Sequence, residues 1–136
     1  MNGDAPLTAL LVDEAQPIRL LLRNTLEARP LRLIEASTVS EAWALILVER
    51  PALVITEMWL PGEDPLEFCR VLKRKAETAG TRVVVLTTMA GEQNHGRAVA
   101  AGADEVVTKP FRPAQLLAIV DRLLDWPAGK RWQASS

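Results

Sequence analysis

The stretch LVITEMWLPG, residues 53–62, places an apolar run directly before a carboxylate, Glu57, and a Pro-Gly break soon after it. A short run of apolar and β-branched residues is typical of a strand that is buried on both faces of a parallel sheet. Such a strand delivers the acid that follows it to the edge of the sheet. Glu57 is therefore a candidate functional residue: a nucleophile, a metal ligand, or a charge that imitates a reacted state.

The same kind of run recurs along the chain and alternates with segments of helical period. Helix starts are indicated by the capping box Thr38-x-x-Glu41, by Asp64 followed by Pro65, and by Pro113. Strands are predicted at residues 9–12, 31–35, 53–56, 83–87 and 105–107.

Five strands that alternate with five helices predict an α/β fold with right-handed crossovers and a parallel sheet covered on both faces. The length of 136 residues fits one domain with a sizeable core. We expect that domain to span residues 1–126 and residues 127–136 to form a tail or the stump of a linker.

The amino-acid composition of the chain argues against several classes of function. Sixteen basic residues nearly cancel seventeen acidic ones, which argues against a nucleic-acid footprint and against a membrane-surface patch. The apolar runs are too short to span a bilayer, and the N-terminus lacks the pattern of a signal peptide. Cys69 is the only cysteine, which excludes an internal disulfide. We expect a cytoplasmic domain.

Polar side chains follow the predicted strands, and the carboxyl ends of parallel strands share one edge of the sheet. Three carboxylates gathered there would repel one another unless a cation relieved them. Mg²⁺ suits clustered oxygen ligands, and a lysine ammonium could serve from the other side. The residues at these strand ends are Asp13, Glu14, Glu57, Thr87, Thr88 and Lys109.

Four fragments in this order resemble the receiver domain of bacterial two-component response regulators. They are LLVDE at 10–14, LVITEMWLPG at 53–62, VVLTT at 84–88 and AGADEVVTKPF at 101–111. The resemblance covers roughly residues 8–126. It implies a flavodoxin-like, doubly wound sheet of five parallel strands in the order 2-1-3-4-5, with five helices.

The resemblance implies a metal site and a phosphoacceptor position. Asp13 and Glu14 match the acidic pair that holds Mg²⁺, and the backbone carbonyl of Trp59 would supply a third protein oxygen. Glu57 stands at the phosphoacceptor position and also belongs to the expected metal set.

The resemblance also implies which residues would contact a phosphoryl group. Thr87 matches the contacting hydroxyl, Thr88 the small neighbour that lines the pocket, and Lys109 the pairing lysine. Pro110 matches a proline that follows a cis peptide bond. Val106 stands where many receivers carry a switch Tyr or Phe, and a valine has no ring to swing inward.

The main departure is Glu57, where the family places aspartate. The glutamate side chain is longer by about 1.5 Å, and a misplacement of about 1 Å can cost on the order of 100-fold in rate. We therefore predict a signalling module that works without normal phosphorylation and binds Mg²⁺ weakly. The alternative is a working Mg²⁺-dependent receiver that accepts phosphate on Glu57.

Enzymes and carriers of similar topology fit less well. A phosphatase of the haloacid dehalogenase type needs an Asp-x-Asp motif after a strand, and the sequence has none. A flavin carrier needs a phosphate-binding loop after the first strand, where this chain has the acids of DEAQPIR. We expect no enzyme activity, and no nucleic-acid or membrane binding by this domain. The expected partner is a protein on the face of helix 4, strand 5 and helix 5, with a sensor histidine kinase as one candidate.

Three further residues have simpler interpretations. Cys69 lies on the apolar stripe of a helix and is predicted to pack in the core. His95 has no second ligand at metal spacing and is predicted to lie at the surface. Trp59 follows a strand in an exposed loop, where it could bind a partner or cover the acidic pocket.

Overall fold

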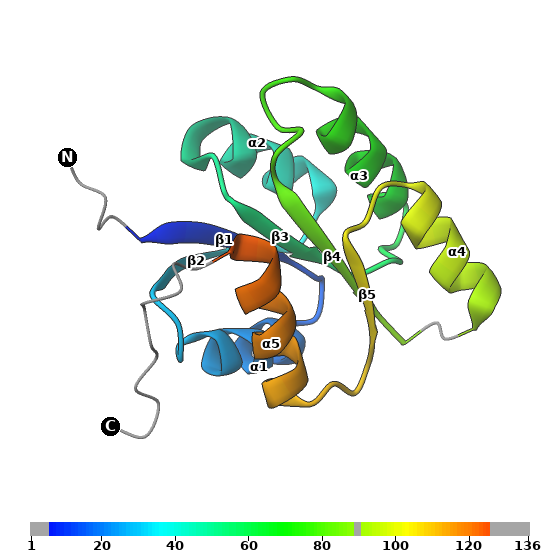
Figure 1. Ribbon diagram of the computed structural model, residues 1–136. Coiled ribbons are helices and arrows are strands. Elements are labelled where there is room, and N and C mark those ends of the chain that lie inside the picture. The colour runs from blue at the N-terminus through cyan, green and yellow to red at the C-terminus, as the bar shows by residue number, and fades with distance from the viewer. Residues whose placement is uncertain (1–5, 89–90, 126–136) are drawn as a thin grey trace.

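Strands and helices alternate strictly along the chain (Figure 1). The structure is a computed structural model that describes residues 6–88 and 91–125. Its elements are β1 (Leu7–Val12), α1 (Gln16–Leu26), β2 (Leu31–Ala36), α2 (Val39–Glu49), β3 (Leu53–Thr56), α3 (Pro65–Arg74), β4 (Arg82–Thr87), α4 (Glu92–Ala100), β5 (Glu105–Thr108) and α5 (Pro113–Leu124).

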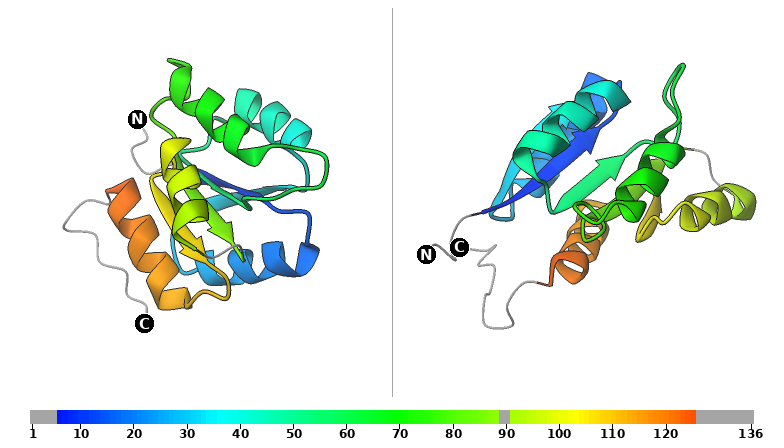
Figure 2. Two further views of the ribbon diagram at one scale, coloured as in Figure 1. Left: turned by 90° about the vertical axis from the view of Figure 1, so that its right-hand side faces the viewer. Right: turned by 90° about the horizontal axis from the view of Figure 1, so that it is seen from above.

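The strands form one parallel sheet in the order β2-β1-β3-β4-β5. The predicted flavodoxin-like fold is thus confirmed. Helices α1 and α5 lie on one face of the sheet, and α2, α3 and α4 cover the other (Figures 1 and 2). This arrangement buries both faces of the central strands, which explains their unbroken apolar sequences.

Successive residues of each strand enter opposite halves of the core. Leu10 and Val12 pack with α2 and α3, whereas Ala9 and Leu11 pack with α1 and α5. This period of two follows from the pleat of a β-strand. A shift in register by one residue would exchange the two sets, so two apolar faces define the pairing strongly.

The predicted helix starts are confirmed in detail. The Thr38 side chain accepts a hydrogen bond from the backbone N–H of Glu41, and Asp64 caps α3 in the same way through Glu67. Both bonds satisfy an amide that lacks a partner in the first turn of a helix. Glu41 reaches back to the N–H of Ser37, one residue before the cap.

Most element bounds differ by one or two residues from those predicted. β1 begins at Leu7 because this end of the strand pairs with β2, which apolar patterning alone did not indicate. α4 forms a complete helix although Asn94 and Gly96 lower its intrinsic stability. None of the described helices is long and apolar enough to cross a membrane. The tail predicted at residues 127–136 lies outside the described residues.

Candidate functional site

The site residues stand one position beyond their strands, where backbone hydrogen bonds extend the sheet. The N–H of Asp13 donates to Ala36 at 3.1 Å, and that of Glu57 donates to Val12 at 3.0 Å. The N–H of Lys109 donates to the carbonyl of Thr87 at 2.8 Å. The backbones of these acids and of the lysine are therefore held by the sheet and not by free loops.

Lys109 joins the two acids. Its Nζ lies 2.9 Å from Asp13 Oδ2 and 2.6 Å from Glu57 Oε1. The side chains are 12% exposed for Lys109, 6% for Asp13 and 8% for Glu57, so water screens these contacts poorly. The sequence therefore predicted correctly that these three residues converge.

The pKa of Lys109 reflects two opposing influences. Burial favours the neutral amine and lowers the pKa, whereas the hydrogen bonds and charges of Glu57 and Asp13 raise it. The effect of the two acids is larger than the effect of burial, so the pKa of Lys109 is raised above its ordinary value. The ammonium is a permanent partner of both acids at neutral pH.

The second oxygen of Glu57 turns back to its own backbone. Oε2 accepts hydrogen bonds from the N–H of Met58 at 2.6 Å and of Trp59 at 3.1 Å. With Oε1 on Lys109, both carboxylate oxygens are engaged. Oε2 thus accepts two hydrogen bonds and Oε1 accepts one, and together these contacts fix the orientation of the carboxylate.

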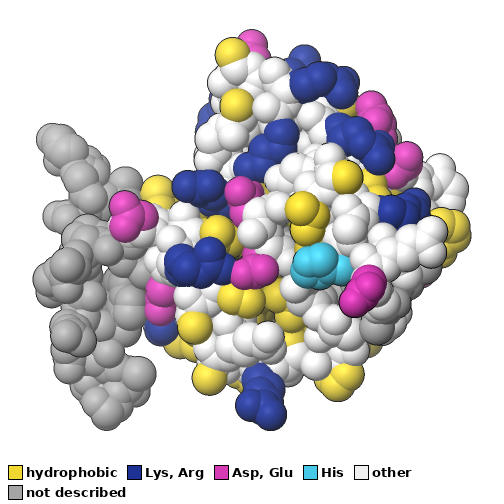
Figure 3. Space-filling model, turned by 45° about the vertical axis from the view of Figure 1, so that its right-hand side comes forward, with side chains coloured by type: hydrophobic (Ala, Val, Ile, Leu, Met, Phe, Trp, Pro, Cys, Tyr) yellow, Lys and Arg dark blue, Asp and Glu magenta, His cyan; other side chains and the backbone are white. Residues whose placement is uncertain are grey.

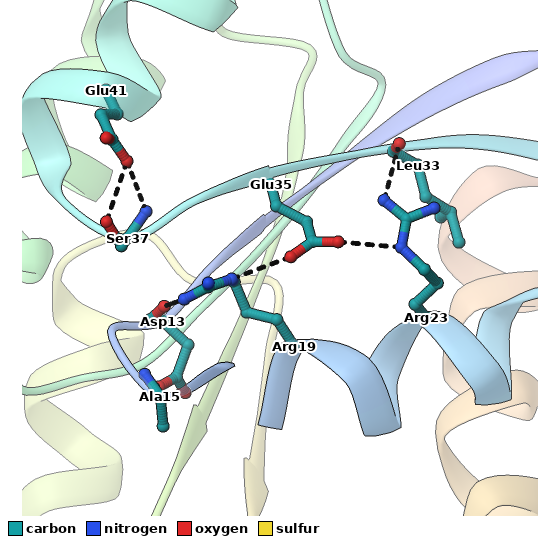
Figure 4. A network of polar contacts seen from close by, with 8 residues as sticks. All are labelled: Asp13, Ala15, Arg19, Arg23, Leu33, Glu35, Ser37 and Glu41. Atoms are coloured by element: carbon teal, nitrogen blue, oxygen red, sulfur yellow. Dashed lines mark hydrogen bonds and ion pairs between the residues drawn. The ribbon is translucent and has the colours of Figure 1, made fainter. Parts of the chain in front are cut away.

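A second network holds the loop that carries Asp13 (Figure 4). Arg19 donates to the backbone carbonyl of Asp13 and, at 2.8 Å, to Glu35. Arg23 donates to the other oxygen of Glu35, also at 2.8 Å. The side chain of Asp13 accepts from the N–H of Ala15 at 2.9 Å. Arg19 was not among the predicted site residues, although an arginine in the first helical turn after an acidic strand end is a signal in the sequence.

The other predicted site residues are placed differently. Thr87 is buried at the end of β4, while Thr88 is exposed. Val106 is half-buried and packs against the core beneath α2, α3 and α4. The peptide bond between Lys109 and Pro110 is cis, as predicted. Trp59 is 65% exposed, as expected for a residue in a surface loop.

The fit of the site to Mg²⁺ can be judged from its donors. Carboxylate oxygens are of the right kind for this ion. However, Glu14 is exposed, and the residues that the structure describes contain no group of three acidic, histidine or cysteine side chains poised for a metal. Lys109 stands between Asp13 and Glu57 where a cation would neutralise them. The donors suit Mg²⁺ in kind, but they are not arranged as a ready metal site.

The two remaining sequence interpretations hold. Cys69 is fully buried, and burial raises the pKa of its thiol to about 11, so the reactive thiolate is suppressed. His95 is exposed on α4 (Figure 3). Acidic, basic and apolar side chains are interspersed on the side of the molecule that Figure 3 shows.

Comparison with known proteins agrees with this fold. The family model described as the response regulator receiver domain matches residues 9–121. The phosphate regulon transcriptional regulatory protein PhoB of Pseudomonas aeruginosa is 34% identical over 117 residues, covering 86% of this chain and 51% of that protein. The transcriptional regulatory protein ResD of Bacillus subtilis is 34% identical over 115 residues, covering 85% of this chain and 47% of that protein. The chain thus spans about half the length of these curated relatives.

Solved structures give the same result. A response regulator from Thermotoga maritima matches with a TM-score of 0.80 and 29% identity, covering 88% of this chain and 98% of that one. The chemotaxis response regulator CheY4 of Vibrio cholerae matches with a TM-score of 0.79 and 25% identity, covering 87% and 98%.

The fold and the Asp13–Glu57–Lys109 cluster define a signalling module built on a doubly wound sheet. The chain belongs to the family of two-component response regulator receiver domains. Such domains are generally signalling modules and not enzymes, interact with histidine kinases and effector domains, and generally bind Mg²⁺ at the phosphorylation site.

Proposed function

We propose that this chain is a receiver module whose signalling conformation is held by the ion pair of Glu57 and Lys109 and does not depend on phosphorylation. The observation that carries the proposal is the 2.6 Å contact between Lys109 Nζ and Glu57 Oε1. A lysine that would meet a phosphoryl group in a working receiver already has a carboxylate partner.

The geometry of Glu57 supports a poor phosphoacceptor. Phosphoryl transfer depends on an attacking oxygen in line with the leaving group. Oε2 is occupied by the N–H groups of Met58 and Trp59, and Oε1 by Lys109. These contacts orient the carboxylate and hold Oε1 on Lys109, and the longer side chain also changes the position of the attacking atom. The module is therefore a binding protein and not a catalyst.

Weak Mg²⁺ binding is part of the proposal. Asp13, Glu14, Glu57 and the Trp59 carbonyl would hold the ion, which would supply positive charge beside the acids. Lys109 already pairs with both Asp13 and Glu57 and offsets one of their two negative charges, so the ion has to compete with it. This competition is the reason to expect weaker binding than at an aspartate-bearing site.

The output would be read by a protein on the face formed by α4, β5 and α5. Val106 in β5 carries no ring that could gate this face, and its side chain packs inward on the core. If the module stays in one conformation, its signalling is regulated by its own abundance or by the availability of its partner. The division into a receiver-like domain at residues 1–126 and a tail at residues 127–136 is part of the same proposal.

Intact-mass measurement after incubation with acetyl phosphate and Mg²⁺ tests the proposal. The native chain should gain no phosphoryl group. Glu57→Asp should gain one if four residues are competent: Asp13, Glu14, Thr87 and Lys109. Peptide mapping identifies the labelled residue. A stable phosphoryl adduct on Glu57 would instead establish the alternative, a working receiver with a glutamate acceptor.

A further inference from the structure

Helix α2 has an unusual surface. Its sequence VSEAWALILVE is apolar around nearly the whole circumference, a composition typical of a buried helix. Yet only Ala42 and Ile46 are fully buried. Leu47 is 66% exposed and Val48 is 76% exposed. This side of α2 therefore presents apolar surface that nothing in the described part of the chain covers.

A groove lies beside this surface. It has a volume of about 410 Å³ and runs between the C-terminal parts of α2 and α3. Trp43 and Leu47, one helical turn apart, form one wall, and Val71 of α3 forms the other. The volume falls within the range of clefts that take up a ligand or an anchoring side chain.

The walls of the groove are held by the core. The Trp43 ring meets the buried Phe68 ring edge to face, with centroids 5.1 Å apart and an angle of 81°. At one end, the hydroxyl of Thr78 donates to the carbonyl of Leu72 at 2.7 Å. The groove thus exists before any partner arrives, which lowers the entropic cost of binding.

The charges around the groove favour an acidic partner. Arg50 and Lys75 lie at its rim, and neither side chain makes a hydrogen bond or ion pair with another described residue. Glu77 is the only acid in the lining among the described residues. Both cations stand at helix C-termini, and their full charges exceed the partial negative charges found there.

We propose that this α2–α3 groove docks a helical segment of a partner protein, one that presents apolar anchors beside acidic residues. The anchors would pack on Trp43, Leu47 and Val71, and the acids would meet Arg50 and Lys75. A protein segment fits better than a small molecule, because the uncovered apolar surface continues outside the groove to Val48. The groove lies at helix C-termini, away from the strand ends that carry Glu57, so this docking is independent of the acidic site.

Fluorescence anisotropy with two designed helical peptides tests the proposal. Both carry leucine and tryptophan at positions i, i+3, i+4 and i+7, and one has glutamate and the other lysine at the flanking positions. The native chain should bind the glutamate peptide roughly tenfold more tightly, because two exposed cations each contribute modestly to affinity. The double variant Arg50→Glu/Lys75→Glu should reverse this preference.

Leu47→Ser should weaken binding of the glutamate peptide roughly tenfold, since it removes an apolar contact from one wall of the groove. The matched control is Leu20→Ser on α1, where the leucine is 55% exposed and the helix lies on the opposite face of the sheet from α2 and α3 (Figures 1 and 2). Circular dichroism verifies that all variants are folded. Equal binding of both peptides, or equal effects of Leu47→Ser and Leu20→Ser, overturns the proposal. So does sedimentation showing a dimer of this chain that Leu47→Ser dissociates, because the occupant is then a second copy.

Discussion

Lys109 and Glu57 form a buried ion pair across the sheet edge, with Nζ 2.6 Å from Oε1, although β4 lies between the strands that carry them. Their contact therefore spans the end of β4, where Thr87 is buried. The pair therefore links three neighbouring strand ends, and Asp13 adds the end of β1. A change in charge at Glu57 acts directly on this whole edge.

Removing the lysine should be costly. Lys109→Met leaves the buried acids Asp13 and Glu57 without their cation, and we expect a loss of about 3–5 kcal/mol in the free energy of unfolding. Urea denaturation measures this loss. Lys75→Met is the control, because Lys75 is exposed and its side chain makes no hydrogen bond or ion pair with another residue that the structure describes. Its effect should stay within about 0.5 kcal/mol.

The partner of that lysine can be identified by a double-mutant cycle. If Glu57 is the main partner, Glu57→Gln combined with Lys109→Met should destabilise by less than the sum of the single variants, with a coupling of about 0.5–3 kcal/mol. Additive effects would show that the pair contributes nothing beyond its separate members.

High pH should weaken the fold through Lys109. The pKa of this residue is raised in the native protein above the ordinary 10.5, so the native state holds its proton more tightly than the unfolded chain does. The resulting stability is fully present below the ordinary pKa and is lost as the pH rises through the raised value. Unfolding free energies between about pH 9 and 12 should fall more steeply for the native chain than for Lys109→Met. Parallel curves for the two proteins would contradict this prediction.

Magnesium should bind the native chain on the order of tenfold more weakly than it binds Glu57→Asp, because Glu57 remains on Lys109. The backbone N–H of Trp59 donates a hydrogen bond to Glu57. Binding of the ion beside Glu57 should therefore change the fluorescence of Trp59. Since the chain has four tryptophans, Trp59→Phe serves as the control and should abolish the response. The prediction fails if millimolar Mg²⁺ changes neither the fluorescence nor the melting temperature of either protein.

The strands, the helix starts and the strand order could be predicted from the sequence. Alternating apolar runs define the strands, and Asp64 with Pro65 defines a helix start, because these signals act over a few residues. Strand order then brings Asp13, Glu57 and Lys109 to one edge.

Side-chain conformation was not predictable in the same way. Glu57 Oε2 folds back on Met58, and Arg19 reaches the carbonyl of Asp13, through rotamers that depend on tertiary neighbours. The uncovered face of α2 was missed because a helix with apolar residues around most of its circumference gives only a weak directional signal in the sequence.

The last prediction concerns whether Glu57 holds the conformation of the site. Glu57→Gln keeps the size of the side chain but removes its charge, so the ion pair with Lys109 is lost while Asp13 remains. If the pair holds the edge of the sheet, the neighbouring amides should open more often, because local opening costs less where stabilising contacts are missing. We expect hydrogen exchange to become about tenfold faster around Thr87 and in α4, equivalent to about 1.4 kcal/mol. Exchange in β2, at the far side of the sheet, should be unchanged. Glu27→Gln is the matched control, since that acid is exposed at the end of α1. If neutralising Glu57 leaves protection around Thr87 and α4 as it is in the native chain, Glu57 does not hold the state, and its carboxylate serves only the local structure of the loop after β3.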